Sequence, residues 1–443
     1  MAREMKDSGV EWIGEIPVNW QIRKVKDFYQ MQTGFTPDTK REDYYADETE
    51  GCDWLTIGDL QGKKYIPQTT KSHISKSYVQ KFNPPIIPQG SLLYSFKLSV
   101  GQVAITDRDI YSNEAIAAFL PDDNVCLDFL YYSSNMIIEN ANENIYGAKI
   151  LNQELIKNAY VIYPPIDEQR RIALLLDEKC GKIDMVLEKT RASIEEYKKL
   201  KQAVITQTVT KGIRGDRKMK DSGIEWIGEI PLGWKLVPFR HVLKERQEKN
   251  SPIKSEERLS LSIDLGVTLY AEKTTNLDRF KDDFEQYKLA HEGDLVMNSM
   301  NMIVGATGVS DYFGCVSPVY YTFYDEVEDH VTAKYCEYLF RSKAMLRVLY
   351  SLGKGIYAIV RGDDRVNTCR LKVAKEDLKG IVIPVPSVEE QREIVSYLKW
   401  KCKEIDELIA KKEQCLAEIE NYKKSLIYEY VTGEKEVPQE DQV

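Results

Sequence analysis

The chain has 443 residues, of which 43% are hydrophobic and 30% charged, a balance typical of a folded protein with room for two to four domains. This composition excludes a disordered chain, and no run of about 18 apolar residues is present that could span a bilayer. The first residues lack the apolar stretch of a secretory signal, so we expect a cytoplasmic protein without a membrane partner.

The eight cysteines are scattered, and no two have Cys-x-x-Cys spacing. Because a structural zinc site needs clustered ligands, the sequence predicts reduced thiols and no metal site. The formal net charge of −9 argues only weakly against a nucleic-acid partner, since binding depends on local clusters. Lysines and arginines do cluster over 195–220, although a solvated helix end and linker would explain this segment equally well.

A thirteen-residue segment occurs twice, as MKDSGVEWIGEIP over 5–17 and as MKDSGIEWIGEIP over 219–231. The two copies, called the tags below, differ only by Val10 and Ile224. A tryptophan follows each copy at the same spacing. Self-similarity of this kind indicates a duplicated architecture.

A second repeat pairs residues 164–184 with 386–406, and both copies run on to a Val-Thr dipeptide at the same offset. Apolar residues recur there at heptad a and d spacing, which predicts two long amphipathic helices. The predicted seam residues are Leu176, Ile183, Leu187, Ile194 and Tyr197 in the first helix, and Leu398, Ile405, Ile409, Leu416 and Ile419 in the second.

Polar residues interrupt both seams at the same two places, Thr190 and Lys201 in the first helix and Lys412 and Lys423 in the second. A polar seam residue costs stability but fixes register. A single amphipathic helix usually faces a core, but two matching stripes favour an intramolecular coiled coil. If a pseudo-two-fold axis relates the halves, the helices are antiparallel, and about 43 residues give a rigid spacer of roughly 60 Å.

The predicted fold class is therefore α/β (α+β), with two globular domains separated by two long antiparallel helices that form an intramolecular coiled coil. The regions between the repeats resemble each other little, which suggests two modules that perform one task on different targets. Two readers on a pseudo-two-fold rod suit a bipartite DNA site. The predicted segments are a first domain with its tag at 1–163, a spacer helix at 164–212, a tag and second domain at 213–385, a second helix at 386–433 and a polar tail at 434–443.

The combination of KDSGVEWIGEIP-x-x-W, PP-x-x-EQRRI and a long helix ending near Val-Thr resembles the specificity subunits of type I restriction–modification systems, over essentially the whole chain. The resemblance implies that the variable regions, about 18–160 and 232–380, are target-recognition domains that bind double-stranded DNA. It also implies that the helices dock two methyltransferase subunits, through which restriction (motor-nuclease) subunits join. In that family adenine is methylated at N6, with S-adenosylmethionine, ATP and Mg²⁺ expected on the partner subunits and no cofactor in this chain.

The first variable region resembles the commonest domain pattern of the family. Thr33-Gly34-Phe35-Thr36-Pro37 stands where the family has a Gly-Gly-Thr-Pro-like loop, with Phe35 in place of the second glycine. The second variable region has no such loop and carries Met297-Asn298-Ser299-Met300 instead. We infer that the two half-sites differ and that the target is asymmetric.

Catalytic motifs are missing from the sequence. Asn83-Pro84-Pro85-Ile86 resembles the base-binding motif of adenine methyltransferases, but Ile86 cannot stack on a base, so a turn is predicted. No Gly-x-x-x-x-Gly-Lys-(Ser/Thr) phosphate loop is present. Asp177-Glu178-Lys179 holds a nuclease-like Asp-x-Lys, but it lies on the heptad helix, where a solvated face is expected. We assign no catalytic residue.

Sequence readout requires side chains that reach base edges, together with phosphate contacts that fix register. For each candidate alone, an ordinary surface or turn role is the alternative. A DNA-binding regulator with two heads that acts without partners, or a scaffold with no DNA role, would be the competing functions. The candidates for DNA contact are Thr36, Lys40, Arg41, Lys97, Asn113, Asn298, Asn301, Arg361 and Arg365, with Lys149, Lys211, Arg214 and Lys354 for phosphates.

Overall fold

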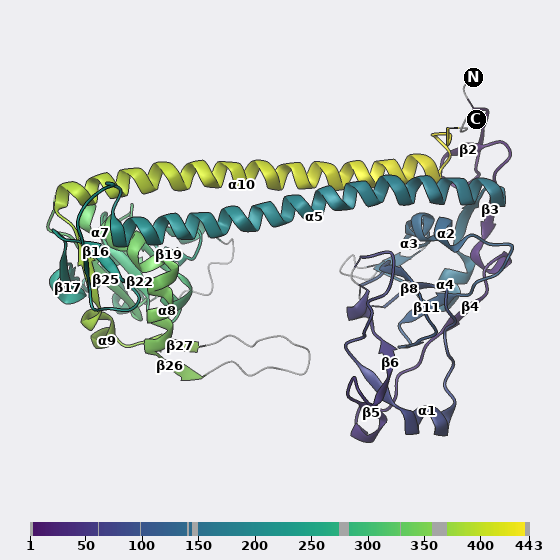
Figure 1. Ribbon diagram of the computed structural model, residues 1–443, viewed down its shortest axis with the longest axis horizontal. Coiled ribbons are helices and arrows are strands. Elements are labelled where there is room, and N and C mark those ends of the chain that lie inside the picture. Colours follow the sequence, from purple (N-terminus) through teal and green to yellow (C-terminus); the bar gives the residue numbers. More distant parts are fainter. Residues whose placement is uncertain are drawn as a thin grey trace. The chain divides into compact units, whose positions relative to one another are not determined.

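Two compact units make up the chain in the computed structural model. Unit 1 comprises 1–190 and 415–443, and unit 2 comprises 191–414. Each unit holds one variable region and parts of two long helices, α5 (Ile166–Lys211) and α10 (Val388–Val431) (Figure 1). The structure describes residues 3–60, 62–97, 99–139, 141–143, 149–273, 283–327, 329–356 and 370–438.

The central sheet of unit 1 has the antiparallel order β4-β11-β8-β9. Its two inner strands, β11 and β8, are buried on both faces, because alternate side chains enter different cores. Leu92 and Tyr94 join one apolar cluster, whereas Leu93 joins another. These strands are β4 (Met31–Thr33), β11 (Ile116–Phe119), β8 (Leu92–Ser95) and β9 (Val103–Ile105).

Smaller sheets and short helices surround this sheet. The tag folds as a hairpin, and the strands that enter and leave the variable region pair with each other, with Lys24 opposite Tyr160. A second sheet has the order β10-β6-β7-β5. The strands are β1 (Met5–Asp7), β2 (Glu15–Pro17), β3 (Gln21–Lys24), β5 (Tyr45–Ala46), β6 (Gly51–Leu55), β7 (His73–Ser75), β10 (Tyr111–Ser112), β12 (Asn142–Glu143), β13 (Lys149–Ile150) and β14 (Tyr160–Tyr163), and the helices are α1 (Lys76–Phe82), α2 (Leu127–Ser133), α3 (Asn135–Ile138) and α4 (Gln153–Asn158).

Unit 2 repeats this framework despite its unlike sequence. Its tag is again a hairpin, its entering and leaving strands again pair, with Lys235 opposite Val385, and its central sheet has the order β18-β25-β22-β23. The strands are β15 (Met219–Asp221), β16 (Glu229–Pro231), β17 (Lys235–Pro238), β18 (Lys244–Glu245), β19 (Leu259–Ser262), β20 (Gly266–Leu269), β21 (Lys288–Ala290), β22 (Leu295–Asn298), β23 (Thr307–Val309), β24 (Gly314–Val316), β25 (Tyr320–Tyr324), β26 (Gly353–Ile356), β27 (Arg370–Val373) and β28 (Val382–Val385). The helices are α6 (Tyr270–Lys273), α7 (Val331–Arg341), α8 (Lys343–Leu352) and α9 (Lys375–Gly380).

The two long helices run antiparallel within each unit (Figure 1). In unit 1 the Lys423 ammonium contacts both carboxylate oxygens of Asp184 at 2.6 and 2.8 Å. In unit 2 Lys201 contacts Asp406 in the same way at 2.7 and 2.6 Å. Both lysines are polar seam residues of the predicted heptads, and each pairs with the opposite helix. These equivalent pairs hold the helices in one register.

Burial follows the predicted seam. Because only two helices are paired, seam residues that no domain covers keep one side open to solvent.

The predicted fold, two α/β domains with two long antiparallel helices, is confirmed. No helix in the described ranges has the length and apolar character needed to cross a membrane. Leu176, Leu187, Ile194, Leu398 and Ile405 are buried, and Ile183, Tyr197, Ile409, Leu416 and Ile419 are half-buried.

Two leucines of α5 provide a test of this packing. Leu176 is fully buried in the core of unit 1, whereas Leu174 is 73% exposed. We expect Leu176→Ala to lower the free energy of unfolding by about 2–5 kcal/mol, because it removes buried methyl groups and leaves a cavity. The matched Leu174→Ala should change it by less than about 0.5 kcal/mol. Chemical denaturation measures both, and equal effects would contradict the assigned seam.

Candidate nucleic-acid interface

A buried carboxylate joins the start of α5 to residues on both sides of the tag in unit 1. Glu168 Oε2 accepts a hydrogen bond from the Trp20 indole N–H at 2.8 Å, and Oε1 pairs with Arg3 at 2.5 Å. The Arg3 guanidinium lies 4.9 Å from the centre of the Trp20 ring. Both carboxylate oxygens therefore have partners, which compensates for removing the charge from water.

Unit 2 contains the same arrangement. Glu390 Oε2 accepts from the Trp234 indole N–H at 2.9 Å, and Oε1 pairs with Arg217 at 2.5 Å. Arg217 lies 5.6 Å from the Trp234 ring centre. The repeated tag and the repeated helix are thus joined by one set of contacts, used twice. We call each set of Trp, Glu and Arg a junction.

The far end of the other long helix reaches each junction. Gly433 follows α10 with φ +79°, and a Cβ there would lie 2.5 Å from Pro17 and 3.0 Å from the Trp20 ring. Gly212 follows α5 with φ +73°, and a Cβ there would clash with Arg217. Glycine is required at both positions by the left-handed backbone and by the lack of space.

The Gly34–Pro37 loop of unit 1 is held against the end of β10. A Cβ at Gly34 would clash with the Ser112 carbonyl, and the Phe35 N–H donates to that carbonyl at 2.9 Å. Phe35 does not have a left-handed φ, so a second glycine is not needed here. Its ring instead stacks on Tyr78, with ring centres 5.8 Å apart. The departure from the family loop is therefore accommodated by aromatic packing.

This loop brings several predicted DNA contacts of unit 1 near one another. Thr36 is exposed on it and Lys40 is exposed shortly after it, and Arg41 forms two 2.8 Å bonds to Asp43. Asn113 follows Ser112 directly, and its Oδ1 accepts the Ala115 N–H at 3.0 Å. The structure therefore groups the Thr36 loop with Asn113.

Two other predicted contacts of unit 1 already have acidic partners. Lys97 is exposed and lies 3.5 Å from Glu114, directly after Asn113. Lys149 pairs with Glu139 at 3.2 Å and belongs to a separate small sheet. Both lysines would have to exchange a carboxylate for a phosphate in order to contact DNA.

In unit 2 the predicted contacts lie around the end of β22. Asn298 is 9% exposed, and its Oδ1 accepts the Met300 N–H at 3.0 Å, which shapes the turn. Asn301 is exposed on the same turn. Lys354 on β26 is highly exposed and contacts Asp377 at 3.0 Å. The predicted contacts Arg361 and Arg365 lie outside the described residues.

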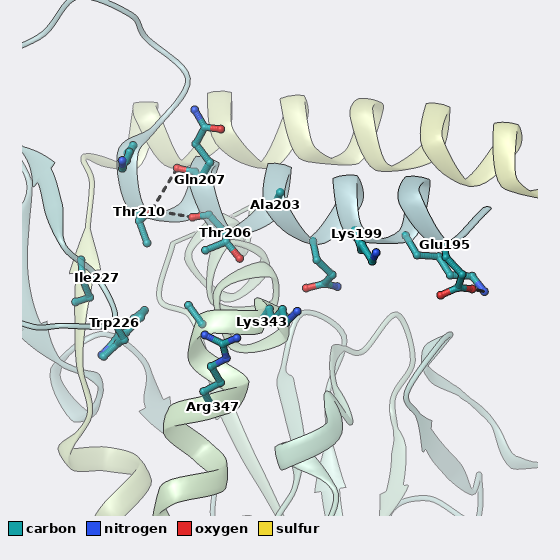
Figure 2. Close-up of a pocket in the computed structure, with 14 residues that line it drawn as sticks. Glu195, Lys199, Ala203, Thr206, Gln207, Thr210, Trp226, Ile227, Lys343 and Arg347 are labelled. Carbon is teal, nitrogen blue, oxygen red and sulfur yellow. Dashed lines mark hydrogen bonds and ion pairs between the residues drawn. The ribbon is translucent and has the colours of Figure 1, made fainter. Parts of the chain in front are cut away.

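The two phosphate candidates at and just beyond the end of α5 differ in their surroundings. Arg214 makes two bonds to Glu393 of α10 at 2.6 and 3.0 Å, so its charge already has a partner. Lys211 lines a hollow of about 820 Å³ between α5, the second tag and α8 (Figure 2). We call it the basic hollow, and its charged lining residues are Glu195, Lys198, Lys199, Lys211, Lys343 and Arg347.

Asp177 is not on a purely solvated face, which corrects the interpretation of Asp-x-Lys. Its carboxylate binds Lys64 at 2.6 and 2.7 Å and accepts the Tyr132 hydroxyl at 2.6 Å. Burial and then this hydrogen bond raise the pKa of Tyr132 above its ordinary value. Lys64 also pairs with Asp128 at 2.5 Å, so the cluster fixes the first domain to α5. No sequence motif pointed to Lys64.

The remaining chemical candidates have structural roles. Asn83 ends α1 with a left-handed φ of 42°, so the Asn-Pro-Pro-Ile segment begins as a turn, as predicted. Within the described ranges, no three His, Cys, Asp or Glu side chains are placed to hold a metal ion.

The junction makes a direct prediction. We expect Glu168→Ala to lower the free energy of unfolding by roughly 3–5 kcal/mol, because Arg3 and the Trp20 N–H would lose their shared buried partner. Glu178→Ala, on the exposed face of the same helix, should leave the denaturation midpoint unchanged. A Glu168→Ala protein as stable as the Glu178→Ala control would show that the junction does not hold the tag.

Comparison with known proteins shows what the chain is similar to. The sequence model of the type I restriction modification DNA specificity domain matches residues 17–196. The chain is 23% identical over 440 residues to the MjaVIII type I restriction enzyme specificity subunit of Methanocaldococcus jannaschii, with 94% of this chain and 93% of that protein covered. It is 25% identical over 247 residues to the MjaIX specificity subunit of the same organism, and this match spans 54% of the chain and 55% of that protein.

A solved structure agrees on the fold. It comes from work on the structural basis of complex assembly and conformational transition of the type I R-M system. It superposes with a TM-score of 0.65 and covers 95% of this chain and 99% of that one, at 15% identity. Residues 17–196 therefore match a type I restriction modification DNA specificity domain, and the chain is similar to a type I restriction enzyme specificity subunit over 94% of its length.

Proposed function

We propose that the chain is a non-catalytic subunit that reads DNA and directs type I N6-adenine methylation and ATP-dependent restriction to an asymmetric, bipartite target. The observation that carries this proposal is one frame that holds two unlike surfaces. Both units repeat the Trp, Glu and Arg junction. The exposed loops above it differ, with a Gly34 loop on β10 in unit 1 and the Asn298 turn in unit 2. Different loops on the same framework would recognise different DNA half-sites.

The outer faces of the long helices support two equivalent docking sites for partner proteins. Val186 and Leu200 of α5 are 48% and 46% exposed, and Leu408 and Tyr422 of α10 are 37% and 60% exposed. These four residues occupy corresponding places in the two repeats. Single exposed apolar residues need no explanation, but a repeated pair fits a surface that a partner covers. We assign this surface to two methyltransferase subunits, with restriction subunits bound through them.

The chemistry belongs to those partners in this proposal. S-adenosylmethionine, ATP and Mg²⁺ would bind to the methyltransferase and restriction subunits. The methyltransferase would also extrude the target adenine, because a duplex hides its amino group. The chain would then choose the site without forming or breaking a bond, in the cytoplasm of a bacterium or archaeon.

Exchange of a domain tests the reading role. Residues 18–160 can be replaced by the corresponding region of another specificity subunit, since β3 and β14 pair at the base of the domain. We expect one half of the methylated motif to change and the other half to stay, as mapped by genome-wide detection of N6-methyladenine. An unchanged motif would favour a scaffold without a DNA role. Tight, specific DNA binding by the purified chain alone would favour the autonomous regulator.

Charge introduced on the outer helix face tests the docking role. We expect Leu200→Glu with Leu408→Glu to prevent co-purification of the methyltransferase, because a partner would have to bury the new carboxylates. The folded chain should be retained, since both side chains are exposed. Glu188→Lys on another exposed face of α5 provides the control and should keep the complex. A complex that survives the double substitution would place docking elsewhere.

A further inference from the structure

The basic hollow of unit 2 gathers positive charge in a chain whose net charge is −9. Five of its lining residues are cations, and Glu195 is the one carboxylate among them. We propose that this hollow holds the sugar–phosphate backbone of duplex DNA and supplies contacts that do not depend on sequence. The proposal rests on the DNA-reading function proposed above and adds a site to it.

Three of the cations have no charge partner in the described part of the chain. Lys343 and Arg347 lie one turn apart on α8, and both approach the face of α5 that carries Ala203 and Thr206 (Figure 2). Lys211 closes the hollow at the end of α5. Their side chains are exposed and make no ion pair or hydrogen bond with a described residue. Unpaired cations that converge on one hollow favour an anionic ligand.

The other two cations have only weak partners. Lys198 and Lys199 pair with Glu195 and Glu196 on the exposed surface of α5, at 2.9 Å each. Such surface pairs contribute little and are readily exchanged. The hollow also lies at the start of α8, where the helix dipole favours negative charge.

Unit 1 supplies the comparison, because it has a hollow in the equivalent place. This neutral hollow, of about 590 Å³, is likewise lined by the tag through Trp12 and Ile13 and by the end of a long helix. Asn135 and Glu139 occupy it with the spacing that Lys343 and Arg347 have in unit 2. Its charged residues are one lysine, Lys424, and one glutamate, Glu139.

The neutral hollow shows that the frame does not require the cations. Both hollows are lined by the Trp-Ile pair of a tag and by the end of a long helix, and the tag folds as the same hairpin in each unit. The positive charge of the basic hollow is therefore not needed for the unit to fold. It would serve a contact that only the second domain makes.

The extent of the cations favours a polymer over a small ion. Lys198 and Lys211 are thirteen residues apart on one helix, which places them roughly 20 Å apart along its axis. A duplex strand advances about 3.4 Å of helix axis per phosphate, so several phosphates fall within that length. A single phosphate ion would leave most of the cations unused.

The test is the salt dependence of binding to a duplex that lacks the target sequence. We would use the full chain assembled with its methyltransferase and measure fluorescence anisotropy between about 50 and 200 mM KCl. For Lys343→Gln with Arg347→Gln, the slope of log affinity against log salt should fall in magnitude by about two. The preference for the methylated motif over other sequences should be unchanged.

Two further variants make the result decisive. Lys189→Gln with Lys424→Gln removes the same charge outside the basic hollow and should leave the slope unaltered. Glu139→Arg leaves two cations and no carboxylate in the neutral hollow and should increase the slope. A wild-type slope in the Lys343 and Arg347 variant would overturn the proposal, as would a loss of methyltransferase binding with unchanged DNA binding, which would identify an acidic protein surface as the ligand. A wild-type complex that binds no duplex would instead refute the proposed DNA-reading function itself.

Discussion

One buried carboxylate in the first turn of each long helix determines how the rest of the chain is attached. Glu168 and Glu390 lie where the helix dipole favours negative charge, and each satisfies a tryptophan N–H and an arginine at once. Removal of either partner would leave a charged group buried without compensation. Separation of the tag from the helix therefore costs free energy. The end of the opposite helix also reaches the junction, because the glycine that follows it packs against the tryptophan in unit 1 and the arginine in unit 2.

We expect this attachment to make the domains exchangeable units. In both units the chain enters and leaves the variable region through paired strands directly beside the junction, β3 with β14 and β17 with β28. Inside each region a central antiparallel sheet buries both faces of its inner strands, so the core requires alternating apolar residues and not a particular sequence. Loops at the rim are then free to diverge while the base of the domain stays the same.

The sequence predicts the features that depend on local periodicity. The repeated tags and the heptads were sufficient for two long helices and their antiparallel order, and the lysines at polar seam positions indeed lie between the helices. Contacts between segments distant in the chain were not predictable. Nothing in the sequence near Glu168 indicates Arg3 as its partner. Lys64 likewise lies far along the sequence from Asp177, although the two side chains form an ion pair in the fold. The replacement of a loop glycine by Phe35 could be understood only once Tyr78 was seen to stack on it.

Duplication also gives each half of the chain an internal control. Where the two units agree, as at the junctions and in the lysine–aspartate pairs between the helices, folding and assembly are sufficient reasons for the residues. Where they differ at equivalent places, folding is not sufficient, because the other unit folds without the same residue. Arg347 and Glu139 occupy matching positions in two hollows that are each lined by a tag and the end of a long helix, and they carry opposite charge. In the proposed function, such differences would mark the surfaces on which each half contacts its own part of the DNA target.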